Sequence, residues 1–167
     1  MQLPDAEQLL ALLIEKIRPD VTGNTAIVGI HTGGAWLAER IHRALEITTP
    51  GGVLDISFYR DDYSKIGLHP QVRPSQLPFD VENSHIILVD DVLYTGRTVR
   101  AAVNELFDYG RPTCIDLAVL VDRGGRELPV AARYIGAVLA LPENSMLELR
   151  QSDDGRLSLD LRSLATD

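Results

Sequence analysis

The stretch ILVDDVLYTGRTVRAA, residues 87–102, decides how the rest of the chain is interpreted. Its apolar opening is typical of a buried strand, and it runs directly into two adjacent carboxylates, Asp90 and Asp91. A small polar turn follows, and a helical pattern begins around Gly96. Ligands of parallel α/β sheets bind beyond the carboxyl ends of the strands, so this junction is the first candidate for a functional site.

The flanking sequence alternates strand patterns with helix patterns. Apolar residues at helical spacing between Leu9 and Ile17 predict a first helix, which Pro19 closes. The alternation predicts an α/β fold with a parallel sheet that has an antiparallel edge, flanked by helices and followed by a terminal hairpin turning at Asp154–Gly155. The remaining elements are expected as strands at 25–30, 53–60, 85–91, 114–122 and 134–141, and as helices at 35–47 and 95–110.

Length and composition bound the classes of protein to consider. The chain has 167 residues, 45% of them hydrophobic, which suits a single domain over 1–167. No apolar run approaches the ~20 residues that span a membrane, and the first residues carry no signal pattern, so we expect a cytoplasmic protein. Cys114 is the only cysteine, which excludes an intrachain disulfide and disfavours a cysteine-based zinc site. With a net charge of −8, an anionic ligand would need a local binding site.

A long segment at 61–84 has prolines and charges but few apolar pairs. A stretch of this length without secondary structure is uncommon inside a compact domain. We interpret it as a mobile lid, and a passive surface loop is the alternative that the sequence leaves open. A terminal tail is expected at about 162–167.

The residues after the buried strand suggest a binding site for a phosphorylated sugar. Gly96 lets the backbone approach a ligand, and the helix that follows offers unpaired N–H groups to a phosphate. The paired carboxylates of Asp90 and Asp91 could accept hydrogen bonds from vicinal hydroxyls, as on a ribose, and help to hold Mg²⁺. The alternative is that Asp91 or Thr95 only caps the helix. No Walker loop or dinucleotide fingerprint is present.

Five segments in sequence order resemble one family. They are DISFYRDDYSK (55–65), VDDVLYTGRT (89–98), GRP (110–112), LAVLVDRGGRELP (117–129) and YIG (134–136). The chain resembles the type I phosphoribosyltransferases, and within them the branch of pyrimidine operon regulators that are also uracil phosphoribosyltransferases. The resemblance covers most of residues 25–136. It implies a central, mostly parallel sheet flanked by helices, with a small hood.

The resemblance also implies a role for each matching position. Asp90 and Asp91 would bind the ribose hydroxyls of phosphoribosyl pyrophosphate (PRPP) and assist Mg²⁺, with Arg60 as a further catalytic residue at the base of the lid. The turn after the first strand would be the pyrophosphate loop, where the family often has a non-proline cis peptide. The remaining groups are the 5-phosphate turn (Tyr94, Thr95, Gly96, Arg97, Thr98), the pyrophosphate loop (His31, Thr32, Gly33, Gly34) and the wall against the base (Val121, Asp122, Arg123).

The implied reaction is uracil plus PRPP to uridine monophosphate (UMP) plus pyrophosphate, in a homodimer or higher oligomer that also regulates pyrimidine biosynthesis genes. Relatives commonly carry a basic residue and an arginine in the pyrophosphate loop, whereas this chain has HTGG. The alternative is therefore a weakly catalytic or non-catalytic sensor of UMP or PRPP that acts through RNA or a protein partner. Tyr94 favours a pyrimidine over a purine, although packing on the sheet would also explain a tyrosine.

Direct binding of RNA has weaker support in the sequence. The family regulator uses a basic face that includes its first helix, but here that helix offers Lys16 and Arg18 against several acids. A local patch and an ordinary solvated surface both remain open for four other arginines, Arg40, Arg43, Arg150 and Arg156. His42, His69 and His85 show no spacing typical of a metal site, and Trp36 is expected to pack or to contact another subunit.

Overall fold

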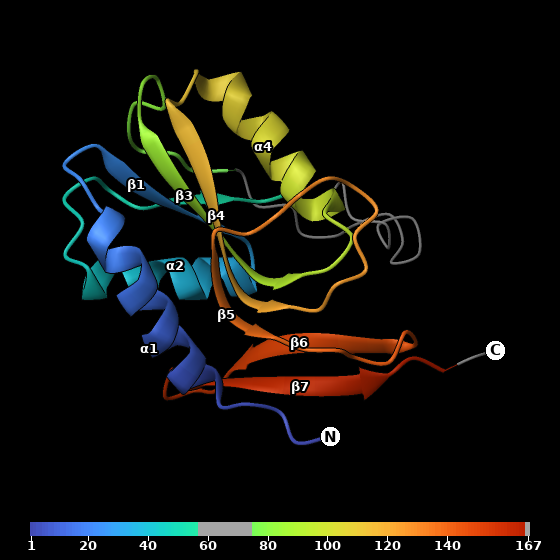
Figure 1. The fold of residues 1–167 in the computed structure, drawn as a ribbon. Helices are drawn as coiled ribbons and strands as arrows, with labels where there is room; N and C mark the ends of the chain where they lie inside the picture. Colours follow the sequence, from blue (N-terminus) through green and yellow to red (C-terminus); the bar gives the residue numbers. More distant parts are fainter. Residues whose placement is uncertain (57–74, 166–167) are drawn as a thin grey trace.

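The computed structural model describes residues 1–56 and 75–165 (Figure 1). Five strands form the central sheet in the order β2-β1-β3-β4-β5, and every neighbouring pair runs parallel. A separate antiparallel hairpin, β6-β7, completes the strands of the described part. The elements are α1 (Ala6–Ile17), a 3₁₀ turn (Arg18–Asp20), β1 (Thr25–Ile30), α2 (Gly33–Ala44), β2 (Gly52–Leu54), β3 (His85–Leu93), α4 (Arg97–Tyr109), β4 (Cys114–Asp122), β5 (Tyr134–Val138), β6 (Ser145–Gln151) and β7 (Leu157–Ser163).

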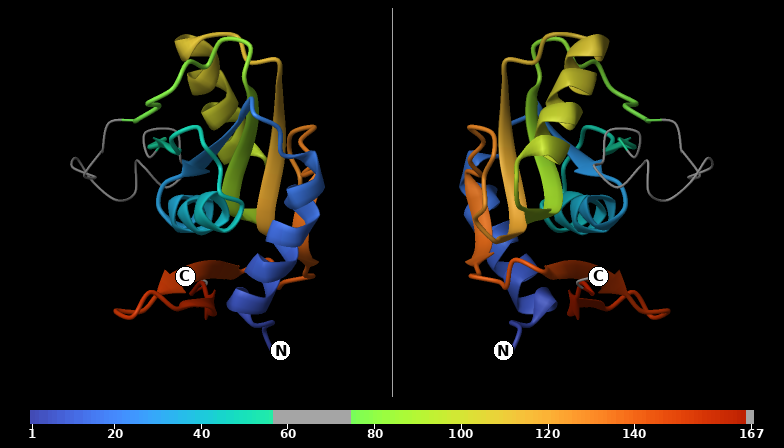
Figure 2. Two further views of the ribbon diagram at one scale, coloured as in Figure 1. Left: turned by 90° about the vertical axis from the view of Figure 1, so that its left-hand side faces the viewer. Right: turned by 90° about the vertical axis from the view of Figure 1, so that its right-hand side faces the viewer.

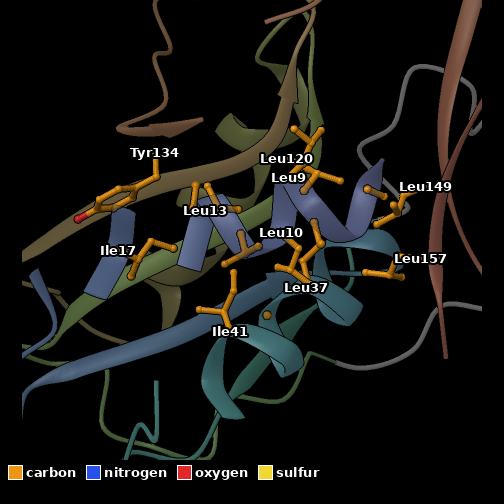
Figure 3. Packing of buried hydrophobic residues seen from close by; sticks show 14 of the residues in the cluster. Leu9, Leu10, Leu13, Ile17, Leu37, Ile41, Leu120, Tyr134, Leu149 and Leu157 are labelled. Atoms are coloured by element: carbon orange, nitrogen blue, oxygen red, sulfur yellow. The ribbon is translucent and has the colours of Figure 1, made fainter. Parts of the chain in front are cut away.

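Helices cover both faces of the sheet, and each face has its own apolar core. On one face, Figure 3 shows Leu10 of α1 beside Leu37 and Ile41 of α2, and all three are fully buried. Leu149 and Leu157 attach the hairpin to this core. On the other face, α4 packs on β3 and β4 through a second cluster that contains Val99 and Leu106. Burial of each such side chain contributes about 1.5–3 kcal/mol to stability.

Local sequence explains where α1 begins and where α4 begins and ends. The Asp5 carboxylate accepts the Glu7 N–H at 2.8 Å and caps α1. Gly96 has a φ of 94° immediately before α4, in the left-handed region that favours glycine. As expected, Gly110 ends α4 and Pro112 lies just beyond it.

Several boundaries differ from the sequence-based expectation. The helix expected at 35–47 spans Gly33–Ala44, the strand expected at 85–91 continues to Leu93, and the strand expected at 134–141 ends at Val138. The strand expected at 53–60 is β2, Gly52–Leu54, because the Asp55 N–H donates to the Ser75 hydroxyl at 3.2 Å instead of continuing the ladder; residues 57–60 lie outside the described part. The helix expected from residue 95 begins at Arg97, since Gly96 is left-handed. Among the residues that the structure describes, the expected antiparallel edge consists of one bridge, Val53–Gln76, and the hairpin is a sheet of its own.

Only part of the segment interpreted as a lid can be placed. Residues 61–74 lie outside the described part, while Gln76 exchanges two 2.8 Å backbone hydrogen bonds with Val53 at the edge of the sheet. Near the chain end, β7 extends to Ser163, so residues 162 and 163 belong to the hairpin and not to the expected tail. Among the described residues, the structure has no helix with the length and apolarity needed to cross a membrane.

Candidate active site

Three loops meet at the carboxyl ends of β1, β3 and β4 and enclose a cavity of about 850 Å³ with the hairpin. Figure 1 shows β6 beneath the end of β3, and both views in Figure 2 show the hairpin standing apart from the main sheet. This placement follows the rule for ligand sites in open α/β sheets. The lining residues come from the turn after β1 (Thr32, Gly33), from the end of β3 through the first turn of α4 (Asp90 to Val99), from the residue just after β4 (Arg123) and from the hairpin and its continuation (Ser145 to Leu149, Leu164).

Asp90 and Asp91 lie at the floor of this cavity. Asp90 is buried, with 4% of its surface exposed, and Asp91 is half-buried. The Asp90 carboxylate accepts the Asp91 N–H at 2.9 Å, and the Asp91 carboxylate accepts the N–H of Val92 at 2.8 Å. These backbone bonds orient two adjacent carboxylates toward one cavity, as the sequence predicted.

The turn His31–Gly34 packs directly against the acidic pair. A Cβ atom on Gly33 would lie 2.4 Å from the Asp91 Oδ2 atom, and one on Gly34 would lie 2.4 Å from the Val89 carbonyl oxygen. Both positions therefore require glycine while the acids keep their places. The His31–Thr32 peptide bond is cis, as the resemblance implied.

The residues of this turn do not all face the same cavity. Thr32 and Gly33 line the 850 Å³ cavity together with the carboxylates. His31 lines a neighbouring cavity of about 590 Å³, with Trp36, His42 and others. Sequence position alone could not separate the two, because the direction of each side chain depends on how the turn folds.

The turn that leads into α4 is held in place by hydrogen bonds from the segment after β4. The Leu93 carbonyl accepts the Arg123 N–H at 3.0 Å, and the Tyr94 carbonyl accepts a guanidinium N–H of Arg126 at 2.8 Å. The Thr95 carbonyl accepts the N–H groups of the next two segment residues, Glu127 at 2.9 Å and Leu128 at 3.1 Å. Three successive carbonyls are thus occupied by segment 123–128.

The helix-capping alternative is not observed at the N-cap of α4, which is Gly96 and has no side-chain hydrogen bond. The Thr95 hydroxyl accepts the Arg97 N–H at 3.2 Å, so this threonine does stabilise the start of α4. Asp91 caps no helix, because its carboxylate accepts the Val92 N–H within β3. The other first-turn amides of α4 lack intrahelical acceptors, as at any helix start, and Tyr94 to Thr98 all line the cavity.

Of the three residues expected against the base, Arg123 lines the cavity, whereas Val121 is buried in the sheet and Asp122 turns toward its own loop. The Arg123 guanidinium stacks 4.1 Å from the centre of the Tyr94 ring and donates to the carbonyls of Ser145 at 2.9 Å and Pro142 at 3.1 Å. Its buried Nε atom has no hydrogen-bond partner among the described residues. Arg123 therefore joins β4, the phosphate turn and the hairpin.

Asp122 is kept ionised by hydrogen-bond donors from its own loop. Burial acts to raise the pKa of Asp122, but the hydrogen bonds from Arg126 and from the Gly124 N–H lower it, and the net pKa lies below the ordinary value. The carboxylate accepts from Arg126 at 2.5 Å and from the Gly124 N–H at 2.9 Å. The loop is thus stabilised by a charged hydrogen bond close to the cavity.

The sequence-based analysis missed several residues of this region. Arg126 stands in the VDRGGRELP segment, which carried the resemblance, but no pattern indicated its contacts. Met146 and Leu164 line the cavity from the hairpin and are 39% and 52% exposed. Their role depends on how the hairpin packs. Arg60, expected as a catalytic residue, lies outside the described part of the chain.

At the opposite ends of the strands, His85 and Asp116 form a second polar cluster near Cys114. The His85 Nε2 atom lies 2.7 Å from the Asp116 carboxylate, and Arg133 donates to the same carboxylate oxygen at 2.9 Å. That oxygen is therefore satisfied by an ion-pair network. The arrangement explains these residues as structural.

Comparisons with known proteins agree with this geometry. The family model of the phosphoribosyl transferase domain matches residues 2–138. A protein of Nitrosococcus oceani named bifunctional protein PyrR is 57% identical over 136 residues, covering 80% of this chain and 77% of that protein. A protein of the same name from Pseudomonas syringae pv. syringae is 46% identical over 170 residues and covers 99% of both chains.

Solved structures with the same fold are also phosphoribosyltransferases. A purine phosphoribosyltransferase of Pyrococcus horikoshii aligns with a TM-score of 0.62 at 26% identity, over 80% of this chain and 82% of that one. A hypoxanthine-guanine phosphoribosyltransferase of Bacillus anthracis aligns with a TM-score of 0.67 at 19% identity, over 84% of each chain, and shows the fold alone. Because these matches agree with the acidic pair and the glycine turn, the chain belongs to the phosphoribosyl transferase family, among the relatives named PyrR.

Proposed function

We propose that this phosphoribosyltransferase joins uracil to PRPP, forming UMP and pyrophosphate, and that it regulates pyrimidine biosynthesis genes. We extend the proposal to a single catalytic domain that works in the cytoplasm as a homodimer or higher oligomer. One observation carries the enzymatic part: Asp90 and Asp91 share the 850 Å³ cavity with the turn 94–98, while Gly33 packs on the Asp91 carboxylate. Sugar, phosphate and leaving-group positions would then adjoin one another.

The proposed roles follow from the chemistry of each group. The Asp90 and Asp91 carboxylates would accept hydrogen bonds from the two ribose hydroxyls. Main-chain amides at the start of α4 would bind the 5-phosphate, with the Thr98 hydroxyl and the Arg97 charge nearby. This turn is supported by segment 123–128, which occupies its carbonyls and limits how far it can move when the phosphate arrives.

The donor set suits a magnesium ion that arrives with PRPP. Carboxylate oxygens are the ligands that Mg²⁺ prefers, and Asp90 and Asp91 present two carboxylates at one edge of the cavity. Because Gly33 has no side chain, the Asp91 carboxylate beside it keeps the position in which its oxygens could bind the ion. These two residues would hold the ion, mainly through the substrate, and the ion would neutralise charge on the departing pyrophosphate.

The remaining residues would orient the substrates and exclude water. Displacement at the anomeric carbon passes through a transition state with oxocarbenium character, which water could intercept. Of the residues 121–123 expected against the base, Arg123 would position the uracil ring, because it lines the cavity, and it would hold the hairpin over the ring through the Ser145 and Pro142 carbonyls. The turn 31–34 would face the pyrophosphate, and Arg60 would act from the lid.

The turn 31–34 favours a second candidate function. Gly33 brings no charge to the leaving group at a position where relatives commonly have arginine, and Asp91 occupies the space next to it. Without that charge, stabilisation of the transition state would be weaker than binding of the sugar phosphate. The alternative is a sensor of UMP or PRPP with little turnover, which acts through RNA or a protein partner.

One assay separates the two functions. We would incubate the protein with labelled uracil, PRPP and Mg²⁺ and measure UMP, with the double variant Asp90→Asn, Asp91→Asn in parallel. The enzyme is supported by turnover that the variant loses. Absence of turnover, with UMP or PRPP still bound in calorimetry, would establish the sensor. If neither turnover nor binding occurs, both functions are wrong.

A further inference from the structure

Arg126 makes polar contacts within its own loop and also with the 5-phosphate turn. Its Nε–H donates to the Val130 carbonyl at 2.9 Å, and one terminal nitrogen donates to the Asp122 carboxylate at 2.5 Å. The other terminal nitrogen donates to the Tyr94 carbonyl at 2.8 Å. The side chain is 24% exposed and is not among the residues that line the cavity.

These bonds connect the two halves of the proposed site. Tyr94 belongs to the 5-phosphate turn, immediately after β3, whereas Asp122 ends β4 in the segment proposed for the base. The Tyr94 ring is also held from this segment, because Arg123 stacks on it and a Cβ atom on Gly125 would lie 2.4 Å from its Cε2 atom. A shift of the base segment must therefore move Tyr94 or break the bond from Arg126.

A lysine could not replace this geometry. The guanidinium is a rigid planar fork whose donors reach acceptors in three directions at once, while an ammonium is a single point on a flexible stem. Loss of Arg126 would also remove the guanidinium from the half-buried Asp122 carboxylate, which would keep its hydrogen bond from the Gly124 N–H. Freed of its lowering contact, the pKa of Asp122 would rise.

We propose that Arg126 is a positioning residue that couples the two subsites, so that occupation of the base segment strengthens binding at the 5-phosphate turn and the reverse. Coupling of this kind is reciprocal, because each ligand prefers the same arrangement of the shared bonds. The inference rests on the proposed function, since it assigns one ligand to each subsite. Arg126 acts through Tyr94 and Asp122 and does not itself touch the substrates.

The test uses a pair of ligands that cannot react with each other. Uracil occupies the base segment and ribose 5-phosphate occupies the turn, and without a pyrophosphate leaving group no UMP forms. Calorimetry measures the dissociation constant of ribose 5-phosphate with and without saturating uracil. In the wild type, we expect uracil to strengthen ribose 5-phosphate binding about fivefold or more. In Arg126→Lys this ratio falls toward one.

Glu127→Gln provides the matched control. The Arg97–Glu127 ion pair, at 2.7 Å, joins the same two segments but is exposed, with 48% and 53% of the side-chain surfaces accessible. This variant should keep the wild-type ratio, and thermal unfolding of both variants checks that the fold is intact.

The possible outcomes are distinct. A wild-type ratio in Arg126→Lys, or a ratio of one in the wild type, overturns the coupling and leaves the proposed function standing when both ligands bind. If the wild type binds neither ligand, the proposed function fails and the coupling fails with it.

Discussion

At the scale of single residues, the glycines beside the acidic pair determine how closely the turn after β1 packs on β3. Gly33 permits Asp91 to approach the turn after β1, and Gly34 permits the same turn to approach β3. The two glycines of HTGG therefore let the two loops pack without intervening side chains. Under the proposed function, the charge on the leaving group would then be neutralised mainly by a magnesium ion, and the position of Asp91 matters because Asp91 would help to hold that ion.

Gly33→Ala tests this packing. The added Cβ would lie 2.4 Å from Asp91 Oδ2 and 2.9 Å from its Cγ, so the carboxylate must rotate away from its place in the cavity. We expect UMP formation to fall on the order of tenfold, the effect of ~1.4 kcal/mol at the transition state. Gly23→Ala, where no atom lies within 4 Å of the new Cβ, should retain wild-type rates. Equal rates for both variants would show that Asp91 does not need its observed position.

How far the site could be predicted depends on whether a residue's role is local. Asp90 and Asp91 were identified because a buried strand that ends in carboxylates has a meaning within ten residues of sequence. Arg126 was not, because its acceptor Tyr94 is 32 residues away. His31 was grouped with the pyrophosphate loop, and its lining of a neighbouring cavity depends on the fold of the turn.

At the scale of elements, the strong periodic segments were predicted and the weakly paired ones were not. The strands at 25–30 and 114–122 match β1 and β4 at both ends, because buried apolar runs specify a central strand. The strand expected at 53–60 is cut short at Leu54, where a side chain from residue 75 takes the next N–H. The hairpin was predicted, but its place apart from the sheet depends on its contacts with α1 and with β3.

One of those contacts is carried by Glu7. Its carboxylate accepts from Arg40 of α2 at 2.7 Å and from the Leu157 N–H of the hairpin at 2.8 Å, so it joins three elements. The hydrogen bond from Arg40 and that from Leu157 lower the pKa of Glu7 below its ordinary value of 4.5. A carboxylate with a lowered native pKa stabilises the fold above the ordinary value, and this contribution disappears as the pH falls through the native pKa.

Glu7→Gln should therefore lower the free energy of unfolding by about 1 kcal/mol at neutral pH, a modest value because solvent screens the partly exposed pair. Urea unfolding from pH 7 down to about pH 3 would measure this, and the variant and wild-type curves should converge at the acidic end. Glu39→Gln removes a more exposed pair, with Arg43, and should change little at any pH. Parallel curves for Glu7→Gln and the wild type would contradict the assigned role.

At the scale of the whole molecule, charge limits how the protein can regulate genes. The net charge is −8, and the arginines considered as a basic patch are already paired. Each has a carboxylate oxygen within 3.7 Å: Arg40, Arg43, Arg150 and Arg156. Binding of RNA through these groups would have to break ion pairs before it neutralised any phosphate.

We therefore predict weak binding of RNA by the wild-type protein. Fluorescence titration of a labelled RNA hairpin at several salt concentrations should give a dissociation constant no tighter than about 10⁻⁴–10⁻⁶ M near physiological salt, with or without UMP. The slope against salt should be shallow, because few phosphates are neutralised. The variant Arg150→Gln, Arg156→Gln should bind as the wild type does, since its arginines are occupied by acids. A nanomolar affinity that UMP strengthens and the variant loses would show that these ion pairs open and that RNA is the direct target.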